Sequence, residues 1–245
     1  MAVGISIPAV ALEYTDNSGV MTVTLPDEYL ILTEKNLSHN TGALKSWGHS
    51  VDSFKRLMND KNIFLYAVDG KGDNQFQLKC WDSDVAATIG DLSSLGGDGL
   101  TDAMAAIGEG IAEGEGNLLE SSVVSQSGQP FFRFTVNVGS FCYVQYLTVC
   151  GGKFYSMVYY NSTAELTDAQ RQTAESVFAT VKVNGGSSTG LFNSNNIATV
   201  ILLGVGILAA VCGIVWVIMT IVNDIRRRRS EPDEIVPDRI EMRRK

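Results

Sequence analysis

The sequence predicts an α+β fold in which an antiparallel sheet packs against about three helices, followed by one C-terminal transmembrane helix. Strand-like segments with alternating apolar side chains are separated by short turns, and three other segments carry apolar residues at helical spacing. A long uncharged apolar run near the C-terminus predicts the membrane span. With 45% hydrophobic residues, a chain of 245 residues has ample material for a packed core.

The first residues, MAVGISIPAVALEY, have two interpretations. The stretch 1–11 ends in Ala9-Val10-Ala11, an A-x-A pattern typical of signal-peptide cleavage, and we expect it to be the remnant of an export signal. It lacks a basic n-region and is short, so we expect Met1 to lie inside a longer signal. The alternative is that these residues form the first buried strand of the domain.

Residues 12–185 are expected to form the exported α+β domain. Its strands alternate in polarity and are bounded by Gly, Pro, Asn and Asp. On the segment around Cys80, for example, Phe76, Leu78 and Cys80 face one way and Gln75, Gln77 and Lys79 the other. The expected strands are 20–26, 29–35, 63–70, 74–81, 117–126, 130–138, 141–150 and 153–161.

Three segments predict helices. Ser50 is a candidate cap for the first helix, and Thr167 with Gln170 forms a capping box at the start of the last one. Gly108 and Gly110 weaken the middle helix. The three apolar faces are Val51, Phe54, Leu57 and Met58; Leu100, Met104, Ile107 and Ile111; and Ala174, Val177, Phe178 and Val181.

The order of elements resembles a known family. The stretches VMTVTLPDEYLILTEKN and YVQYLTVCGGKFYSMVYY, and the closing TDAQRQTAESVFATVKV, resemble the Mog1/PsbP-like fold, and look closest to exported or membrane-anchored clostridial members. The named members of this superfamily bind protein partners: a small nuclear GTPase, or the lumenal face of photosystem II. The resemblance therefore implies this fold and a bias toward partner binding, and it implies no functional residues.

The apolar run at 197–222 contains no charged residue and is long enough to cross the lipid bilayer. An uncharged stretch, 186–196, precedes it as a flexible tether. After it, Arg226, Arg227, Arg228 and Arg229 open a short basic tail, 223–245, which the positive-inside rule places in the cytoplasm. We therefore expect a single-pass cell-membrane protein with its N-terminal domain extracytoplasmic.

Small residues recur at helical spacing within this run. Gly206 with Ala210, and Ala209 with Gly213, form two small-xxx-small pairs that allow two helices to approach closely. They are candidates for a self-association face of the transmembrane helix. Pairs of this kind are common in any span rich in Gly and Ala.

The sequence offers little catalytic chemistry. The two histidines, His39 and His49, are not near a nucleophile motif, and neither G-x-S-x-G nor C-x-x-C occurs. The formal net charge of −8, with no basic patch in the domain, argues against nucleic acid as a partner. We expect no enzyme activity and no cofactor; carboxylates such as Asp82 and Asp84 are the remaining alternative.

Asp69, Asp73 and Asn74 are candidate calcium ligands, although their spacing differs from an EF-hand and such residues are common in turns. We expect no metal site.

The cysteines Cys142 and Cys150 are expected on one strand, too far apart to form a disulfide with each other. Cys80 could pair with either of them, or all three could be buried thiols. The fourth, Cys212, lies in the apolar run.

Aromatic residues gather in the C-terminal half of the domain, where Phe131, Tyr143, Tyr155 and Tyr159 are candidates for an exposed partner surface or for a helix-covered face. The sequence thus favours a non-enzymatic domain that binds a protein partner or acts as an accessory subunit. The alternative is an ectodomain that senses a small molecule or an ion.

Overall fold

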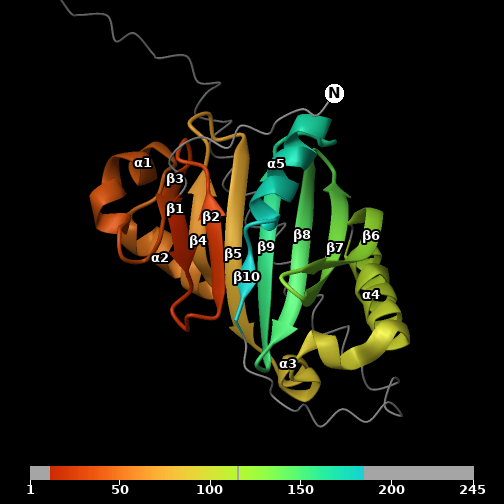
Figure 1. Cartoon of the computed structure of the whole chain (residues 1–245). Helices are drawn as coiled ribbons and strands as arrows, with labels where there is room; N and C mark the ends of the chain where they lie inside the picture. Colours follow the sequence, from red (N-terminus) through yellow and green to blue (C-terminus); the bar gives the residue numbers. More distant parts are fainter. Residues whose placement is uncertain (1–11, 115, 185–245) are drawn as a thin grey trace, which may run out of the picture.

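The computed structural model describes residues 12–114 and 116–184. They form two antiparallel sheets, where the sequence predicted one, with helices on both faces of the larger sheet (Figure 1). The small sheet has the order β1 (Leu12–Thr15), β2 (Met21–Leu25) and β10 (Lys182–Val183). The large sheet has the order β3 (Leu30–Leu32), β4 (Ile63–Val68), β5 (Asn74–Asp82), β9 (Lys153–Asn161), β8 (Phe141–Cys150), β7 (Gln129–Val138) and β6 (Asn117–Gln126).

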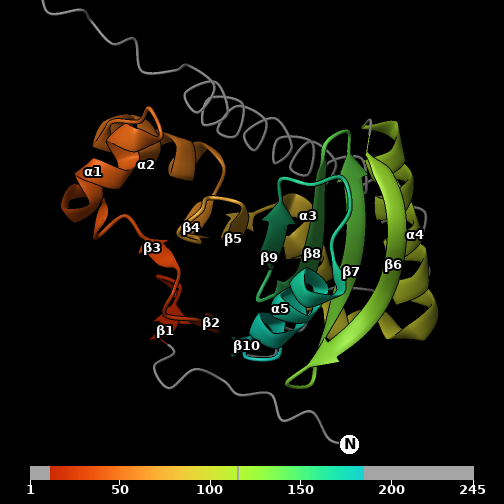
Figure 2. The same cartoon turned by 90° about the horizontal axis from the view of Figure 1, so that it is seen from above.

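The described helices divide between the two faces of the large sheet. Figure 2 shows the small sheet and one helix on one face, and the remaining helices on the other. That single helix is α5 (Asp168–Phe178). The opposite face carries α1 (Thr41–Ser46), α2 (Val51–Asp60), α3 (Asp84–Ile89) and α4 (Gly96–Glu113), with two short 3₁₀ helices at Leu37–Asn40 and Leu92–Leu95.

Three hydrophobic clusters result from this arrangement. The largest lies between the small sheet, α5 and the central strands, and includes Phe76, Phe131 and Phe178. A second lies beneath α3 and α4, and a third beneath α1 and α2. Because clusters occupy both faces, β8 and almost all of β9 are buried along their whole length.

The predicted capping signals are confirmed. The Ser50 hydroxyl accepts from the backbone N–H of Ser53 at the start of α2, and the Ser53 hydroxyl in turn accepts from the Ser50 N–H. At the start of α5 the Thr167 hydroxyl accepts from the backbone N–H of Gln170, and the Gln170 side-chain oxygen accepts from the N–H of Thr167. Each box satisfies backbone donors that have no partner inside the helix.

Two glycines, Gly108 and Gly128, have clear structural roles. Ser127 and Gly128, with φ of 53° and 81°, form the two-residue turn of the β6–β7 hairpin, in the left-handed pattern that suits the twist of paired strands. Gly108 lets α4 approach β6 closely, because a Cβ at this position would lie 3.0 Å from a methyl carbon of Leu118. The glycine that weakens α4 as a helix therefore improves its packing.

Several predicted details are corrected. The expected three helices are present, but the described residues contain five α-helices, since α1 and α3 are too short to show a helical period in the sequence. The strand expected at 29–35 is reduced to Leu30–Leu32. The strand β10 was not predicted from the sequence, and β1 overlaps only the end of the stretch 1–14 that the alternative interpretation made a buried strand; β1 is mostly exposed. Such short strands carry little periodicity of their own.

Strand β5 alternates as predicted, with Phe76 and Leu78 in the largest cluster. On its other face Gln75, Gln77 and Lys79 are also buried, because helices cover that side of the sheet as well. Burial lowers the pKa of Lys79 to about 8, and the charge of the neighbouring Lys61 contributes.

Within the described residues, no helix combines the length and the apolar character needed to cross a membrane. The predicted signal remnant 1–11, tether 186–196, span 197–222 and tail 223–245 lie outside the described residues, with Arg226, Arg227, Arg228, Arg229, Gly206, Ala209, Ala210 and Gly213.

Candidate functional site

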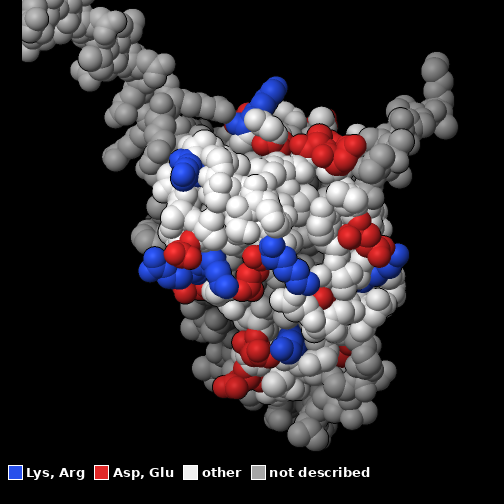
Figure 3. Space-filling view, turned by 90° about the vertical axis from the view of Figure 1, so that its left-hand side faces the viewer, with Lys and Arg blue, Asp and Glu red and all other residues white. Residues whose placement is uncertain are grey.

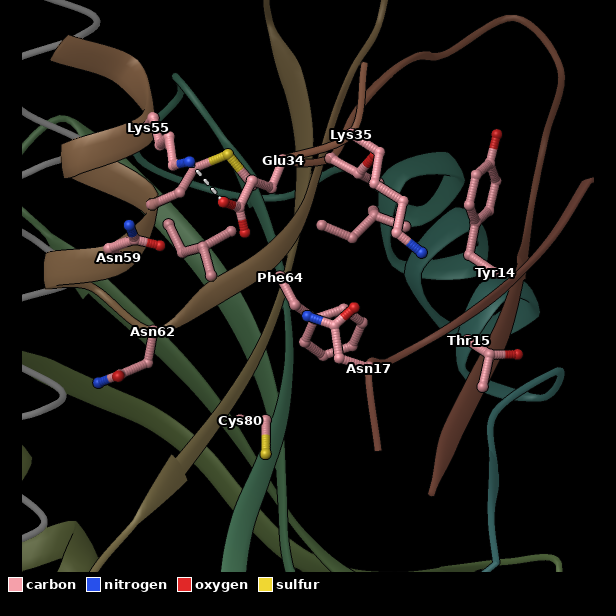
Figure 4. Close-up of a pocket in the computed structure, with 14 residues that line it drawn as sticks. Tyr14, Thr15, Asn17, Glu34, Lys35, Lys55, Asn59, Asn62, Phe64 and Cys80 are labelled. Atoms are coloured by element: carbon pink, nitrogen blue, oxygen red, sulfur yellow. Dashed lines mark ion pairs between the residues drawn. The ribbon is translucent and has the colours of Figure 1, made fainter. Parts of the chain in front are cut away.

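A cleft of about 480 Å³ lies where the small sheet meets the edge of the large sheet and α2 (Figure 4). This volume is within the range of small-molecule sites. Segments that are distant in the chain contribute to it: β1 and the turn after it, the residues after β3, α2 and the turn after it, β4 and β5. The lining residues are Tyr14, Thr15, Asn17, Thr33, Glu34, Lys35, Lys55, Met58, Asn59, Asn62, Ile63, Phe64, Leu65 and Cys80.

The cleft combines an apolar floor with a polar rim. Met58, Ile63 and Leu65 belong to the buried hydrophobic residues and form the apolar part of the lining. The rim includes the exposed amide side chains of Asn17 and Asn59. An apolar surface bordered by a few hydrogen-bonding groups is the usual composition of a ligand site.

The turn between α2 and β4 places a third amide at the rim. Asn62 has φ of 55°, in the left-handed region that asparagine tolerates better than most residues. The backbone N–H of Asn62 donates to the carbonyl of Asn59 at 3.1 Å, and its own carbonyl accepts from the N–H of Cys80 at 3.1 Å. The turn is thus fixed to β5 at the base of the cleft.

The charged groups at the rim are two lysines and one glutamate. Lys55 Nζ lies 2.6 Å from Glu34 Oε1, and this hydrogen bond raises the pKa of Lys55. Lys35 lies in the turn after β3, and its side chain extends into the hollow (Figure 4). The cleft therefore has an excess of positive charge on a chain whose net charge is −8. On the side shown in Figure 3, basic and acidic side chains alternate without a large patch of one sign.

Cys80 connects the cleft to a chain of polar side chains behind it. Burial raises the pKa of the Cys80 thiol, and a hydrogen bond with the Tyr155 hydroxyl opposes this rise. The Tyr155 hydroxyl lies 3.3 Å from Ser18 Oγ, and the Ser18 hydroxyl donates to the Asp16 carboxylate. A raised thiol pKa disfavours the thiolate, so this geometry does not describe an activated nucleophile.

Asp16 holds the turn between β1 and β2 in place. Its Oδ1 atom accepts from the backbone N–H groups of Val20 at 2.7 Å and Met21 at 2.8 Å, and its Oδ2 atom accepts from the N–H of Ser18 at 3.0 Å. This buried carboxylate thereby sets the position of Asn17 on the cleft rim. Its role was not recognised in the sequence.

The aromatic partner surface proposed from the sequence is corrected by the structure. Phe131, Tyr143, Tyr155 and Tyr159 are all buried, with at most 2% of any residue exposed. Phe131, Tyr155 and Tyr159 lie in the cluster beneath α5 and the small sheet, and Tyr143 lies in the cluster beneath α3 and α4. These residues therefore lie on covered faces, the alternative that the sequence left open, because helices and the small sheet pack on both faces of the large sheet.

Asp82 and Asp84 have separate local roles in the structure. Asp82 Oδ1 makes an ion pair with Lys153 Nζ at 3.0 Å, while Asp84 lies in the first turn of α3, where a negative charge favours the helix end.

Two of the candidate calcium ligands, Asp69 and Asn74, take part in hydrogen bonds that hold the turn between β4 and β5. Asp69 Oδ1 accepts from the N–H groups of Lys71 and Asp73, and Asp69 Oδ2 accepts from the Asn74 amide. The side-chain oxygen Oδ1 of Asn74 accepts a hydrogen bond from the Tyr159 hydroxyl at 2.8 Å. Among the described residues, no group of three or more Asp, Glu, His or Cys side chains is placed to hold a metal ion.

The three cysteines of the described domain are free thiols. Cys142 and Cys150 lie buried at opposite ends of β8, as expected, while Cys80 is only half-buried. Neither alternative disulfide of Cys80 is formed.

The cleft was not recognised in the sequence, because its residues come from five short segments between Tyr14 and Cys80. The residues Lys35, Asn59 and Asn62 carry ordinary loop and helix-end signals when they are considered one at a time.

No protein-family model and no curated protein matches this sequence. Among solved structures, the chain is similar to the solution structure of cyanobacterial PsbP (CyanoP) from Synechocystis sp. PCC 6803. The identity is 13% and the TM-score 0.46, over 75% of this chain and 98% of that one. A crystal structure from Bacteroides thetaiotaomicron VPI-5482 is similar at 8% identity and a TM-score of 0.35, over 72% of this chain and 49% of that chain. This chain thus spans about half the length of the Bacteroides protein. Similarities of this degree assign neither a family nor a function.

Proposed function

We propose that this chain is a single-pass envelope protein whose extracytoplasmic domain binds a ligand or partner and catalyses no reaction. The uncharged run 197–222 followed by Arg226, Arg227, Arg228 and Arg229 supports the anchoring and its direction. The resemblance of its sequence to exported Mog1/PsbP-like proteins of clostridia is in line with this role.

The observation that carries the binding role is the cleft. An apolar floor beneath a rim of amides and an excess of lysine suits a small organic molecule with an apolar body and an anionic group. In this role Lys35 attracts the anion, since the Lys55 ammonium is already paired with Glu34. The second candidate function is an accessory subunit that binds a protein. It is favoured by β6, which is an edge strand of the large sheet among the residues that the structure describes.

Ligand retention tests the binding role. The intact chain and its Lys35→Glu variant would be purified in mild detergent, and small molecules and proteins that remain bound would be identified by mass spectrometry. We expect the unmodified chain to retain an anionic molecule, and the amount bound to Lys35→Glu to be at least about tenfold lower. A tenfold decrease corresponds to a loss of roughly 1.4 kcal/mol of binding free energy.

The matched control is Lys45→Glu, which makes the same charge change on the exposed surface of α1, outside the cleft. It should retain the molecule as the unmodified chain does. Identical sets of molecules in all three samples would contradict the cleft as a binding site, and a co-purified protein in all three would support the accessory-subunit function.

Protease accessibility tests the topology. Protease added to intact cells is expected to digest the domain 12–185 and to leave an epitope at the C-terminus protected, because the arginines hold the tail in the cytoplasm. Permeabilised cells are the control, in which both parts are digested. Protection of the domain in intact cells would be incompatible with the proposed orientation.

A further inference from the structure

Phe64 differs from the other phenylalanines of the described domain. It is only partly buried, at the border of the largest cluster, whereas every other phenylalanine in the described residues is buried. Each of those others also lies against another aromatic ring, while Phe64 has no aromatic partner in the described part of the chain. This unpaired ring is part of the lining of the cleft.

Two features of the backbone leave this ring uncovered. The strand β3 ends at Leu32, so within the described chain no strand pairs with the outer side of β4 from Ile63 to Leu65. The register of β4 against β5 also shifts between Ile63 and Leu65, which makes Phe64 the extra residue of a bulge. Phe64 and Leu65 both pack on the largest cluster instead of alternating between the two faces. Bulges redirect side chains in this way and are frequent beside functional sites.

Hydrogen-bonding groups surround the ring. Figure 4 shows Phe64 in the middle of the hollow, with Asn59 and Asn62 on the side of α2, and Asn17 comes from the turn after β1. The amide side chains of these asparagines make no hydrogen bond with a described residue, so each has two N–H donors and one oxygen acceptor available. A hydroxyl group is likewise both a donor and an acceptor. Neighbouring free amides therefore suit a molecule with several hydroxyl groups.

The electrostatics of the cleft favour one carboxylate over a phosphate. Lys55 is paired with Glu34, whereas Lys35 has no ion pair with a described residue. The helix α2 contributes its C-terminal half to the cleft, through Lys55, Met58 and Asn59, and the C-terminal end of a helix is negatively polarised. Phosphate groups prefer the N-terminal end of a helix, while a single lysine is sufficient for a carboxylate.

We propose that the ligand of the cleft is a sugar acid, a pyranose ring that carries a carboxylate. The apolar face of the sugar lies on Phe64, because the negative face of an aromatic ring attracts polarised C–H groups. The sugar hydroxyl groups bond to the amides at the rim, and the carboxylate bonds to Lys35. A fatty acid or an aromatic acid would leave the rim amides without hydroxyl partners. This ligand class rests on the proposed role of the cleft as a binding site.

Matched pairs of sugars test the carboxylate. Glucuronate and galacturonate carry a carboxylate where glucose and galactose carry a CH2OH group, and all four would be titrated into the intact chain in mild detergent by calorimetry. At least one of the two acids is expected to bind about tenfold more tightly than its neutral counterpart, because of the bond to Lys35. In Lys35→Met this preference should disappear, while the affinity for the neutral sugar stays unchanged.

Variants of Phe64 test the aromatic ring. Phe64→Leu keeps an apolar side chain but removes the ring, so it should weaken binding of the acid and of the neutral sugar by the same factor, about fivefold. Phe64→Tyr keeps the ring and should bind both as the unmodified chain does. Thermal unfolding of the two variants, followed by circular dichroism, is the control that both retain the fold.

Equal affinities for the acids and the neutral sugars would overturn the proposal, and so would unchanged binding in a folded Phe64→Leu variant. Tighter binding of hexanoate or benzoate than of either sugar acid would also overturn it, and would identify an aliphatic or an aromatic acid as the ligand of a functional cleft. If none of these molecules binds, the sugar acid is excluded. The retention experiment with Lys35→Glu then decides separately whether the cleft binds another anion or has no binding role.

Discussion

Phe131→Ala is expected to lower the free energy of unfolding of the domain by about 3–5 kcal/mol, the usual cost of removing a buried phenylalanine ring. Phe131 has no exposed surface, and its ring lies 5.1 Å from that of Phe178 in an edge-to-face arrangement. Phe178 in turn stacks on Tyr146 with 3.9 Å between ring centres. The substitution leaves a cavity between β7 and α5, where this group of rings closes the largest cluster.

Urea unfolding of a fragment of residues 12–184 would measure this change. Leu119→Ala is the control, because Leu119 is 43% exposed and its truncation should cost no more than about 0.5 kcal/mol. Similar small losses for both variants would contradict the buried position of Phe131. They would return this residue to the partner surface that the sequence suggested.

Asp16→Ala is the second substitution with a large expected effect, a loss of about 3 kcal/mol or more. It removes the acceptor of three backbone N–H groups, and hydrogen bonds to a charged group contribute roughly 1.5–3 kcal/mol each before losses overlap. The β1–β2 turn would lose its fixed shape, and the Asn17 side of the cleft would lose its position with it.

Asp16→Asn separates the hydrogen bonds from the charge. The amide keeps one oxygen acceptor, so its loss of stability should be smaller, about 1–2 kcal/mol. Both variants would be compared by urea unfolding of the same fragment. Equal stability of Asp16→Ala and the unmodified fragment would contradict the structural role of Asp16.

The aromatic residues show that alternation along a strand locates the strand but does not decide which of its faces is exposed. The sequence located the strands around Phe131, Tyr143, Tyr155 and Tyr159 nearly to the residue. It left open which of these residues are exposed, because an aromatic residue is equally compatible with a covered face and with a contact surface. Packing of helices and the small sheet on both faces decided this, and that packing depends on contacts between residues distant in the chain.

The cleft shows the opposite case, a site with no sequence signal. Lys35 follows a short edge strand, Asn62 is in a turn, and Cys80 is in a central strand. Each residue type is ordinary in its local context. Only the pairing of β4 with β5, and the position of β1 beside them, brings these side chains around one hollow.

The sequence by itself determined the α+β class, the paired strands from 117 to 161, the N-caps Ser50 and Thr167, and most of the apolar faces of three helices. These depend on local periodicity and on hydrogen bonds between near neighbours in the chain. The tertiary structure alone decided that the aromatic residues are buried, that Asp16 holds the cleft rim and that β6 lies at the edge of the large sheet in the described part of the chain. The burial of a side chain, the assembly of a cleft and the position of a strand at the edge of a sheet all depend on contacts between segments far apart in the chain. No local sequence pattern specifies such contacts.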